Sequence, residues 1–182
     1  MLSRTFLWPQ GYTSAAMISV NLDAEFYGRI FYPGIDVSEG DIQRLGWTGM
    51  EYGLPHLLDC FREHGVKGTF FIPGRVAELY PDAVRAIADA GHELGCHGYE
   101  HEILAHFTPE EQLELLKKAK AAIEKAAGRA VTGFRMPEGE ITEQTLVAAK
   151  EAGFAYSSSL SNTDVPYIRQ PAGLPELPIS WT

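Results

Sequence analysis

Two histidines stand four residues apart in the segment His97-Gly98-Tyr99-Glu100-His101, directly after a short apolar run. Upstream, Asp23 ends another apolar run. Two imidazoles and one carboxylate commonly bind a divalent metal ion and leave a coordination position open for water and substrate. If Asp23, His97 and His101 meet in space, the pattern predicts a metal-dependent hydrolase. Histidine pairs at this spacing also occur by chance, and Asp23 could simply cap the loop after its strand.

Short apolar segments alternate with helical patterns along the chain. Strand formers gather in residues 15–22, 67–72, 93–96, 131–135, 155–159 and 174–181. Helical spacing or capping residues mark 54–64, 81–90, 108–127 and 142–152. This alternation predicts an α/β fold with a mostly parallel sheet. Phe26 to Gly53 shows no clear period, and we interpret it as a long loop over the site.

Several polar or turn residues follow these predicted strands. They are Asp23, Pro73-Gly74, His97, Arg135 and Ser159. In parallel α/β folds, active groups lie at the carboxyl ends of strands. We therefore expect one shared site at this rim. Alternatively, the segment Arg135-Met136-Pro137-Glu138-Gly139 could be a plain exit from a strand, with proline and glycine setting the turn.

Composition narrows the class of protein. The 182 residues carry a formal net charge of −9, with 45% hydrophobic and 21% charged residues. We expect a single domain over residues 1–182. The acidic balance argues against nucleic acid or an anionic membrane as partner. No apolar run approaches the roughly 20 residues that span a bilayer. With two cysteines and a poor signal peptide, we expect a cytoplasmic protein with free thiols.

Three motifs, in order, resemble the polysaccharide deacetylase (NodB-homology) family. That family shows Asp-X-Asp, His-Ser/Gly-X-X-His and Arg-X-Pro-X-Gly, each after a strand. Here they stand as Asn21-Leu22-Asp23, His97 to His101, and Arg135 to Gly139. The chain is most similar to the intracellular branch, which includes peptidoglycan-deacetylase-like, allantoinase-like and cyclic-imide-hydrolysing proteins.

The resemblance implies a distorted (β/α) barrel that hydrolyses carbon–nitrogen bonds other than peptide bonds. The substrate would be an N-acetylated sugar or a small cyclic amide or imide. Family ligands carried over to this chain are Asp23, His97 and His101, holding a divalent ion, with zinc the first choice. A backbone N–H near Glu138 would help to hold the oxyanion.

One departure concerns the general base, which the family places at the first acid of the first motif. Here that position is Asn21, whose amide cannot accept a proton at neutral pH. The role of Arg135, which normally pairs with that acid, is open as well. Glu25, Glu138 or Glu140 could replace the base. The alternative is a non-catalytic metal- or ligand-binding pseudoenzyme on the same fold.

A second departure is the end of the chain at Trp181-Thr182, inside a predicted strand. We expect the domain to lack its last βα units and the later histidine that serves relatives as general acid. An exposed final strand would be an association edge, which allows a homo-oligomer. Aromatic residues after Asp23 could stack on a sugar or a flat ring, or could equally be loop packing: Phe26, Tyr27, Phe31, Tyr32 and Trp47.

Overall fold

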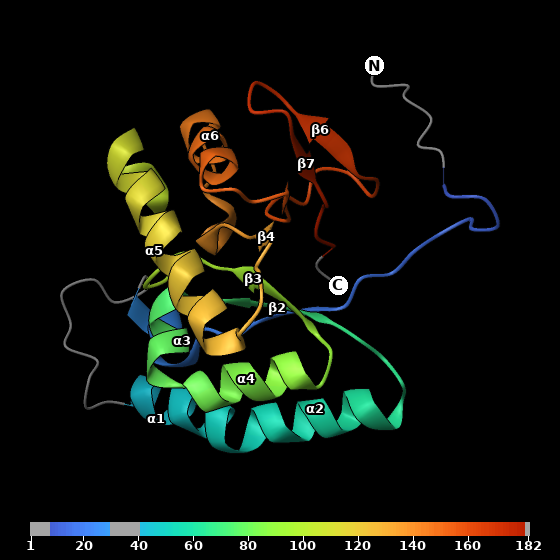
Figure 1. The fold of residues 1–182 in the computed structure, drawn as a ribbon, viewed down its shortest axis with the longest axis vertical. Coiled ribbons are helices and arrows are strands. Elements are labelled where there is room, and N and C mark those ends of the chain that lie inside the picture. Colours follow the sequence, from blue (N-terminus) through green and yellow to red (C-terminus); the bar gives the residue numbers. More distant parts are fainter. Residues whose placement is uncertain (1–7, 30–40, 181–182) are drawn as a thin grey trace.

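Seven strands form one sheet in the computed structural model, which describes residues 8–29 and 41–180. The strands are β1 (Ser19–Asn21), β2 (Thr69–Ile72), β3 (Glu93–Cys96), β4 (Gly133–Phe134), β5 (Tyr156–Ser157), β6 (Tyr167–Arg169) and β7 (Leu174–Glu176). Their order is β1-β2-β3-β4-β5-β7-β6, and every neighbouring pair is parallel except β6 and β7. The predicted α/β fold with a mostly parallel sheet is confirmed (Figure 1).

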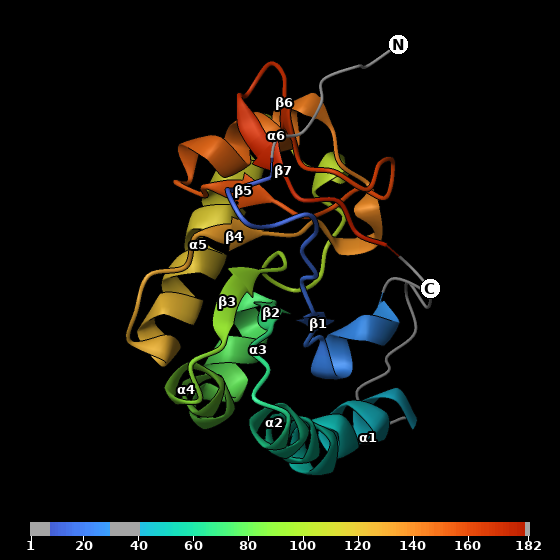
Figure 2. The same ribbon diagram turned by 90° about the vertical axis from the view of Figure 1, so that its right-hand side faces the viewer.

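Helices follow most of the strands and cover one face of the sheet. They are α1 (Asp41–Thr48), α2 (Leu54–Glu63), α3 (Gly74–Leu79), α4 (Pro81–Asp89), α5 (Pro109–Ala127) and α6 (Glu143–Glu151). A π-helical turn (Gly49–Gly53) joins α1 to α2, and 3₁₀ turns cover Ala24–Arg29, Leu104–His106 and Pro137–Gly139. In Figure 2 the strands follow an arc from β1 to β7, with α2, α4 and α5 on its outer side.

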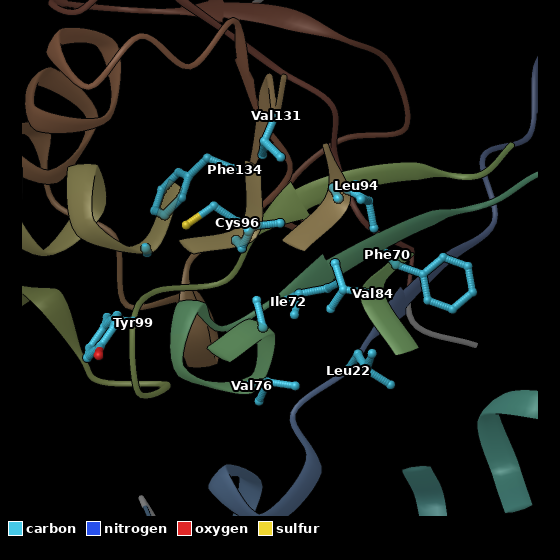
Figure 3. Packing of buried hydrophobic residues seen from close by; sticks show 14 of the residues in the cluster. Leu22, Phe70, Ile72, Val76, Val84, Leu94, Cys96, Tyr99, Val131 and Phe134 are labelled. Atoms are coloured by element: carbon cyan, nitrogen blue, oxygen red, sulfur yellow. The ribbon is translucent and has the colours of Figure 1, made fainter. Parts of the chain in front are cut away.

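Side chains on each strand alternate between the helices and the inside of this arc. Phe70 and Ile72 point toward the helices and pack near Val84 and Leu94 (Figure 3). Phe71, between them in sequence, is fully buried on the inner face, where the Arg135 guanidinium carbon lies 4.1 Å from its ring centroid. The sheet therefore has an apolar outer face, which packs on the helices, and a more polar inner face.

Contacts across the inner face show how strongly the sheet is curled. The Tyr156 hydroxyl on β5 donates to Glu93 on β3, at 2.9 Å, across the intervening β4. Arg135, directly after β4, donates to Asn21 on β1, at 2.8 Å, across both β2 and β3. Such contacts between strands that are not neighbours require a barrel-like curvature, in agreement with the expected distorted barrel.

Most predicted elements are present, with shorter strands. The expected strand 15–22 is β1 (Ser19–Asn21), and 131–135 is β4 (Gly133–Phe134). The helix predicted to have Thr108 as its cap and proline at its first position does begin at Pro109: the Thr108 hydroxyl accepts from the Glu111 N–H, and the Glu111 carboxylate accepts from the Thr108 N–H. Its end at Gly128 has a φ of 71°.

The prediction of one long loop from Phe26 to Gly53 is wrong for the described part of that segment. A 3₁₀ turn, α1 and a π-helical turn occupy it, while residues 30–40, with Phe31 and Tyr32, lie outside the described ranges. Helix α1 packs closely on Ala24–Arg29: a Cβ on Gly46 would lie 2.4 Å from the Glu25 nitrogen. This tertiary packing orders a stretch whose own periodicity is weak.

Two further elements were not predicted, the short α3 after β2 and, near the carboxyl end, β6. The strand expected at 174–181 is only β7 (Leu174–Glu176), and residues 181–182 lie outside the described ranges. The expectation of an exposed final strand is wrong, because β7 lies between β5 and β6. Among the helices of the described residues, none combines the length and hydropathy needed to cross a bilayer.

Candidate active site

Asp23, His97 and His101 converge at the carboxyl ends of β1 and β3. One potential ligand atom from each lies within 4.8 Å of the others. The His97 Nε2 is 3.7 Å from Asp23 Oδ1, and the His101 Nε2 is 3.7 Å from Asp23 Oδ2. Both imidazoles are buried, and Asp23 is nearly so. The structure thus brings together the three side chains whose types indicated a metal centre.

Backbone contacts hold the histidine segment in place. The His97 N–H continues the pairing of β3 by donating to the Ile72 carbonyl at 2.9 Å. The carbonyls of Gly98 and Tyr99 accept from Gly74 and Arg75 at the start of α3, at 3.0 and 2.8 Å. Pro73-Gly74 therefore supports the histidines from outside the cavity and does not line it.

His101 itself has a φ of 62°, in the left-handed region that residues with a side chain seldom adopt. The preceding turn is closed by the Glu102 carboxylate, which accepts from the Tyr99 N–H at 2.9 and 3.1 Å. A strained backbone at a converging cluster of polar groups favours a functional role over chance placement.

Both histidines are held neutral. Burial, followed by the nearby His101, lowers the pKa of His97 to about 3, and burial lowers the pKa of His101 to about 4. The His97 Nδ1 is 2.8 Å from the Arg135 carbonyl, which can only accept, so Nδ1 carries the hydrogen. Nε2 of His97 consequently directs its lone pair toward Asp23, and the contact with Asp23 is not an ion pair.

Asp23 is the residue whose charged form is most disfavoured when no cation is nearby. Burial, and then the charge of Glu138, raise the pKa of Asp23 to about 7, against the opposing effect of Arg135. The Asp23 Oδ1 and the His101 Nδ1 are buried without a hydrogen-bond partner in the described part of the chain. Buried polar groups seldom stay unpaired. The set of donors therefore fits a divalent metal ion, which would supply the missing positive charge.

A cavity of about 590 Å³ opens beside these three residues. Tyr27, Glu138 and Ser159 are among its other lining residues. A second cavity of about 790 Å³ adjoins it and shares Asn21, Arg135 and Ile179. The shared residues mean that a molecule bound next to Asp23 has room to extend toward the apolar wall around Met17 and Leu177.

The aromatic residues after Asp23 divide between packing and the cavity. Phe26 is buried in the core, so packing explains it. Trp47 lies edge-on against Tyr52, with ring centroids 6.0 Å apart, and lines neither cavity. Tyr27 is exposed and lines the smaller cavity. Among the described aromatics of this set, Tyr27 is the one that lines the smaller cavity and is placed to cover a substrate there.

Arg135 is buried, and each of its three guanidinium nitrogens donates a hydrogen bond. Nε donates to the Ser158 carbonyl at 2.7 Å, Nη1 to Asn21 Oδ1 at 2.8 Å, and Nη2 to the hydroxyls of Ser19 and Ser158 at 2.9 and 3.0 Å. Burial lowers the pKa of Arg135 to about 10, so the side chain stays charged at neutral pH. Arg135 thus ties β1 to the ends of β4 and β5.

Asn21 is oriented by this contact. A guanidinium only donates, so the oxygen of the Asn21 amide must face Arg135, and the Nδ2 group is left on the other side. Asn21 lines both cavities, and within residues 8–29 and 41–180 its Nδ2 has no hydrogen-bond partner. Where the family carries an acid, this chain therefore presents a hydrogen-bond donor.

The structure separates the three acids considered as a substitute base. Glu138 lines the cavity with Asp23. Glu25 accepts from the Tyr80 hydroxyl at 3.1 Å and lines neither cavity, and the exposed Glu140 lines neither as well. Proximity in sequence was similar for all three, so only the fold distinguishes them.

The sequence analysis missed two kinds of supporting residue. Ser19 and Ser158 anchor Arg135, and Ser19 could have been found because it shares a strand face with Asn21, two residues away. Glu176 is fully buried, and its Oε1 accepts from the N–H groups of Ser159 and Leu160 at 2.6 and 2.9 Å. The sequence feature that could have identified Glu176 is its position as a lone acid within an apolar strand. None of these three residues lines the cavity with Asp23, although Ser19 lines the larger one.

Comparisons with known proteins place this fold and site in a family. The model of the polysaccharide deacetylase family matches residues 47–157, and the chain belongs to that family. The peptidoglycan deacetylase of Helicobacter pylori is 36% identical over 137 residues, which are 75% of this chain and 46% of that protein. The chain therefore spans less than half the length of this curated relative.

Solved structures agree. A Mycobacterium smegmatis protein assigned as a polysaccharide deacetylase superposes with a TM-score of 0.87 and 36% identity, over 97% of this chain and 62% of that one. A protein from Bacillus anthracis described as a CE4-family pseudoenzyme has a TM-score of 0.59 and 22% identity, over 78% of this chain and 41% of that one. The second likeness shows the fold alone.

Proposed function

We propose that this chain is a metal-dependent hydrolase that removes acetyl groups from an N-acetylated sugar. The observation that carries the proposal is the convergence of two neutral imidazoles with a buried carboxylate, one of whose oxygens has no partner. Family membership supports the reaction class, and the H. pylori relative, a peptidoglycan deacetylase, supports the sugar. Two nitrogens and one carboxylate suit zinc best among common ions.

In this proposal Asp23 and the Nε2 atoms of His97 and His101 hold the ion. When bound, the ion polarises the amide carbonyl and lowers the pKa of a water molecule. The chain's own groups orient the reaction: Arg135 fixes the Asn21 amide, and the backbone N–H of Glu138 donates to the carbonyl oxygen as charge develops on it. Tyr27 covers the bound sugar at the cavity wall.

A second candidate is a non-catalytic protein that binds the same metal and ligand. Asn21 favours it, because the amide at the usual base position cannot accept a proton. Both candidates keep the metal ligands, so metal content does not separate them. The cytoplasmic location, the oligomeric state and the missing carboxyl-terminal βα units stay predictions.

The test is a substrate panel with the metal-loaded chain. Zinc- and cobalt-loaded protein, and the metal-stripped protein as control, would be incubated with N-acetylated sugar oligomers, allantoin and a cyclic imide. We expect acetate release from the oligomers by the loaded protein alone. Turnover of allantoin or the imide instead would correct the substrate. No turnover on any substrate, with the metal bound, would favour the non-catalytic candidate.

A further inference from the structure

The position at which relatives carry a catalytic acid cannot serve as base in this chain. Asn21 uses its amide oxygen to accept from Arg135, and Arg135 is itself held by Ser19 and Ser158. The Asn21 amide cannot flip by 180°, because its NH₂ group would then face a guanidinium that only donates. The Asn21 Nδ2 therefore stays available to a molecule in the cavity, as a donor.

A carboxylate elsewhere in the cavity must then accept the proton, and the candidates are few. Asp23 belongs to the proposed metal ligands. Asp164 lines the larger cavity, on the far side of Asn21 and Arg135 from the histidines. Glu138 is the remaining acid among the described residues that line the smaller cavity with Asp23, His97 and His101.

The backbone holds Glu138 in an unusual conformation at that place. Its φ of 56° and ψ of 4° fall in the left-handed region, inside the short turn Pro137–Gly139. The two residues just before the turn are anchored: the Met136 N–H donates to the Ser159 hydroxyl at 2.9 Å, and Arg135 is tied to Ser158. A strained conformation that neighbouring contacts enforce at a cavity wall favours a functional role for the side chain.

We propose that the Glu138 carboxylate is the general base of this site and that Asn21 is a hydrogen-bond donor to the substrate's carbonyl oxygen. The assignment rests on the proposed function. In relatives the acid comes from the strand that corresponds to β1, and the turn after β4 supplies a donor to the oxyanion. Here the acid comes from the turn after β4, and β1 supplies a neutral donor.

The reaction balances with these two groups. An O–H bond of water breaks and its proton goes to a Glu138 oxygen, while the water oxygen forms a bond to the amide carbon. The carbonyl electron pair moves onto its oxygen, which accepts from the Asn21 Nδ2. When the pair returns, the C–N bond breaks and Glu138 gives its proton to the leaving nitrogen. The products are a carboxylic acid and an amine, and Glu138 is again a carboxylate.

The first test compares Glu138→Gln with the matched control Glu140→Gln, two residues away and outside the cavity. We expect Glu138→Gln to lower kcat by at least about 100-fold, the usual range for loss of a general base, and Glu140→Gln to change it by less than about 3-fold. Chelator competition should show zinc affinity within about 10-fold of the parent in both variants, because Glu138 is not proposed as a ligand. Loss of bound zinc in Glu138→Gln would make it a ligand and overturn the assignment.

Chemical rescue separates a base from a structural residue. Formate should restore part of the rate in Glu138→Ala, since a small carboxylate fits the vacated space, and should not restore His97→Ala. No rescue, with a lowered melting temperature, would give Glu138 a structural role and overturn the proposal. Full activity of Glu138→Gln would overturn it while leaving the proposed function intact. A metal-loaded parent protein without turnover would overturn both.

The variant Asn21→Asp tests the proposed role of Asn21 as a hydrogen-bond donor. It replaces a donor with an acid beside Arg135, so we expect kcat to fall by about 100-fold or more, the range seen on loss of an oxyanion donor. Zinc content, measured in parallel, should not fall. A rise in kcat would place the base at position 21 and overturn the proposal.

Discussion

Two segments leave the same rim of the sheet and meet at the site, but they are held in different ways. The segment after β3, from His97 to His101, is anchored by main-chain hydrogen bonds to β2 and α3. The segment at the end of β1, from Asn21 to Glu25, has one such bond to β2, from the Leu22 N–H to the Phe71 carbonyl at 2.9 Å. Beyond it the segment depends on side chains: Asn21 on Arg135, and Glu25 on Tyr80. The main chain thus positions the histidines, whereas side-chain partners largely set the chemistry of the β1 segment.

The difference shows where this chain can vary. Main-chain anchors depend less on side-chain identity, so the positions of the histidines tolerate substitution around them, except at Gly74, where a Cβ would lie 2.6 Å from Ala119, and at Gly98, with a φ of 75°. An acid exchanged for an amide in the β1 segment keeps its contact with Arg135 through the remaining oxygen, while its proton-accepting ability is lost. The site can therefore keep its geometry and still change the residue that moves protons.

The largest effect is expected from removing one of the two histidines of the proposed metal site. His101→Ala should weaken zinc binding by more than the roughly 100-fold that loss of a supporting outer partner costs, and should abolish turnover. The exposed His106→Ala is the matched control and should retain both. Zinc affinity by chelator competition is the measurement. Unchanged affinity in His101→Ala would remove this histidine from the metal site.

The next effect comes from the partner that holds the β1 segment. Arg135→Lys keeps the charge but loses the planar set of donors, leaving acceptors on Asn21, Ser19 and Ser158 unpaired. We expect a loss of about 3 kcal/mol in the free energy of unfolding, since each buried unpaired group costs about 1–3 kcal/mol. Arg62→Lys, whose partner is the exposed Asp59, should cost less than about 0.5 kcal/mol in the same urea titration. Equal losses would show that the buried network adds little.

A smaller effect tests how α1 supports the β1 segment. A Cβ at Gly46 would lie 2.4 Å from the Glu25 nitrogen, whereas a Cβ at Gly49 would meet nothing within 4 Å. Gly46→Ala should therefore destabilise the protein by about 1–3 kcal/mol through overpacking. Gly49→Ala should be neutral or stabilising by up to about 1 kcal/mol. Thermal unfolding compares the two, and a neutral Gly46→Ala would show that α1 moves away freely.

The smallest effect is the pH dependence of metal binding. The Asp23 pKa is raised to about 7 without metal, while those of His97 and His101 are lowered to about 3 and 4. Between pH 5 and 7 the carboxyl group therefore holds a proton that must leave, and the imidazoles hold none. Zinc affinity should fall about 10-fold per pH unit below 7, equivalent to about 1.4 kcal/mol.

Calorimetry at pH 6 in two buffers with different ionisation enthalpies counts the protons released. One proton is expected. Release of two or three would mean that the histidines are protonated in the metal-free protein. The same shift in Asp23 has a consequence for folding: its contribution to the stability of the metal-free protein is present below pH 4 and is lost as pH rises toward 7.

Much of the fold could be predicted where local signals agree with each other. Helix α5 carries its start in Thr108 and Glu111 and its end in Gly128, so it needs no distant contact to be recognised. Helix α1 was missed because its packing on Ala24–Arg29 stabilises it. Strand β6 was missed because Tyr167–Arg169 gains its order from pairing with β7.

By itself, the sequence determined the order of the three motifs, the types of the metal-ligand candidates and the inability of Asn21 to accept a proton, because these are properties of residue types and spacing. Only the tertiary structure decided which side of the Asn21 amide faces the cavity and which of three nearby glutamates shares that cavity with Asp23. The physical reason is the curl of the sheet. It brings Arg135 across two strands to Asn21 and carries Glu138 to the cavity wall, and no local pattern encodes contacts between strands that are not neighbours.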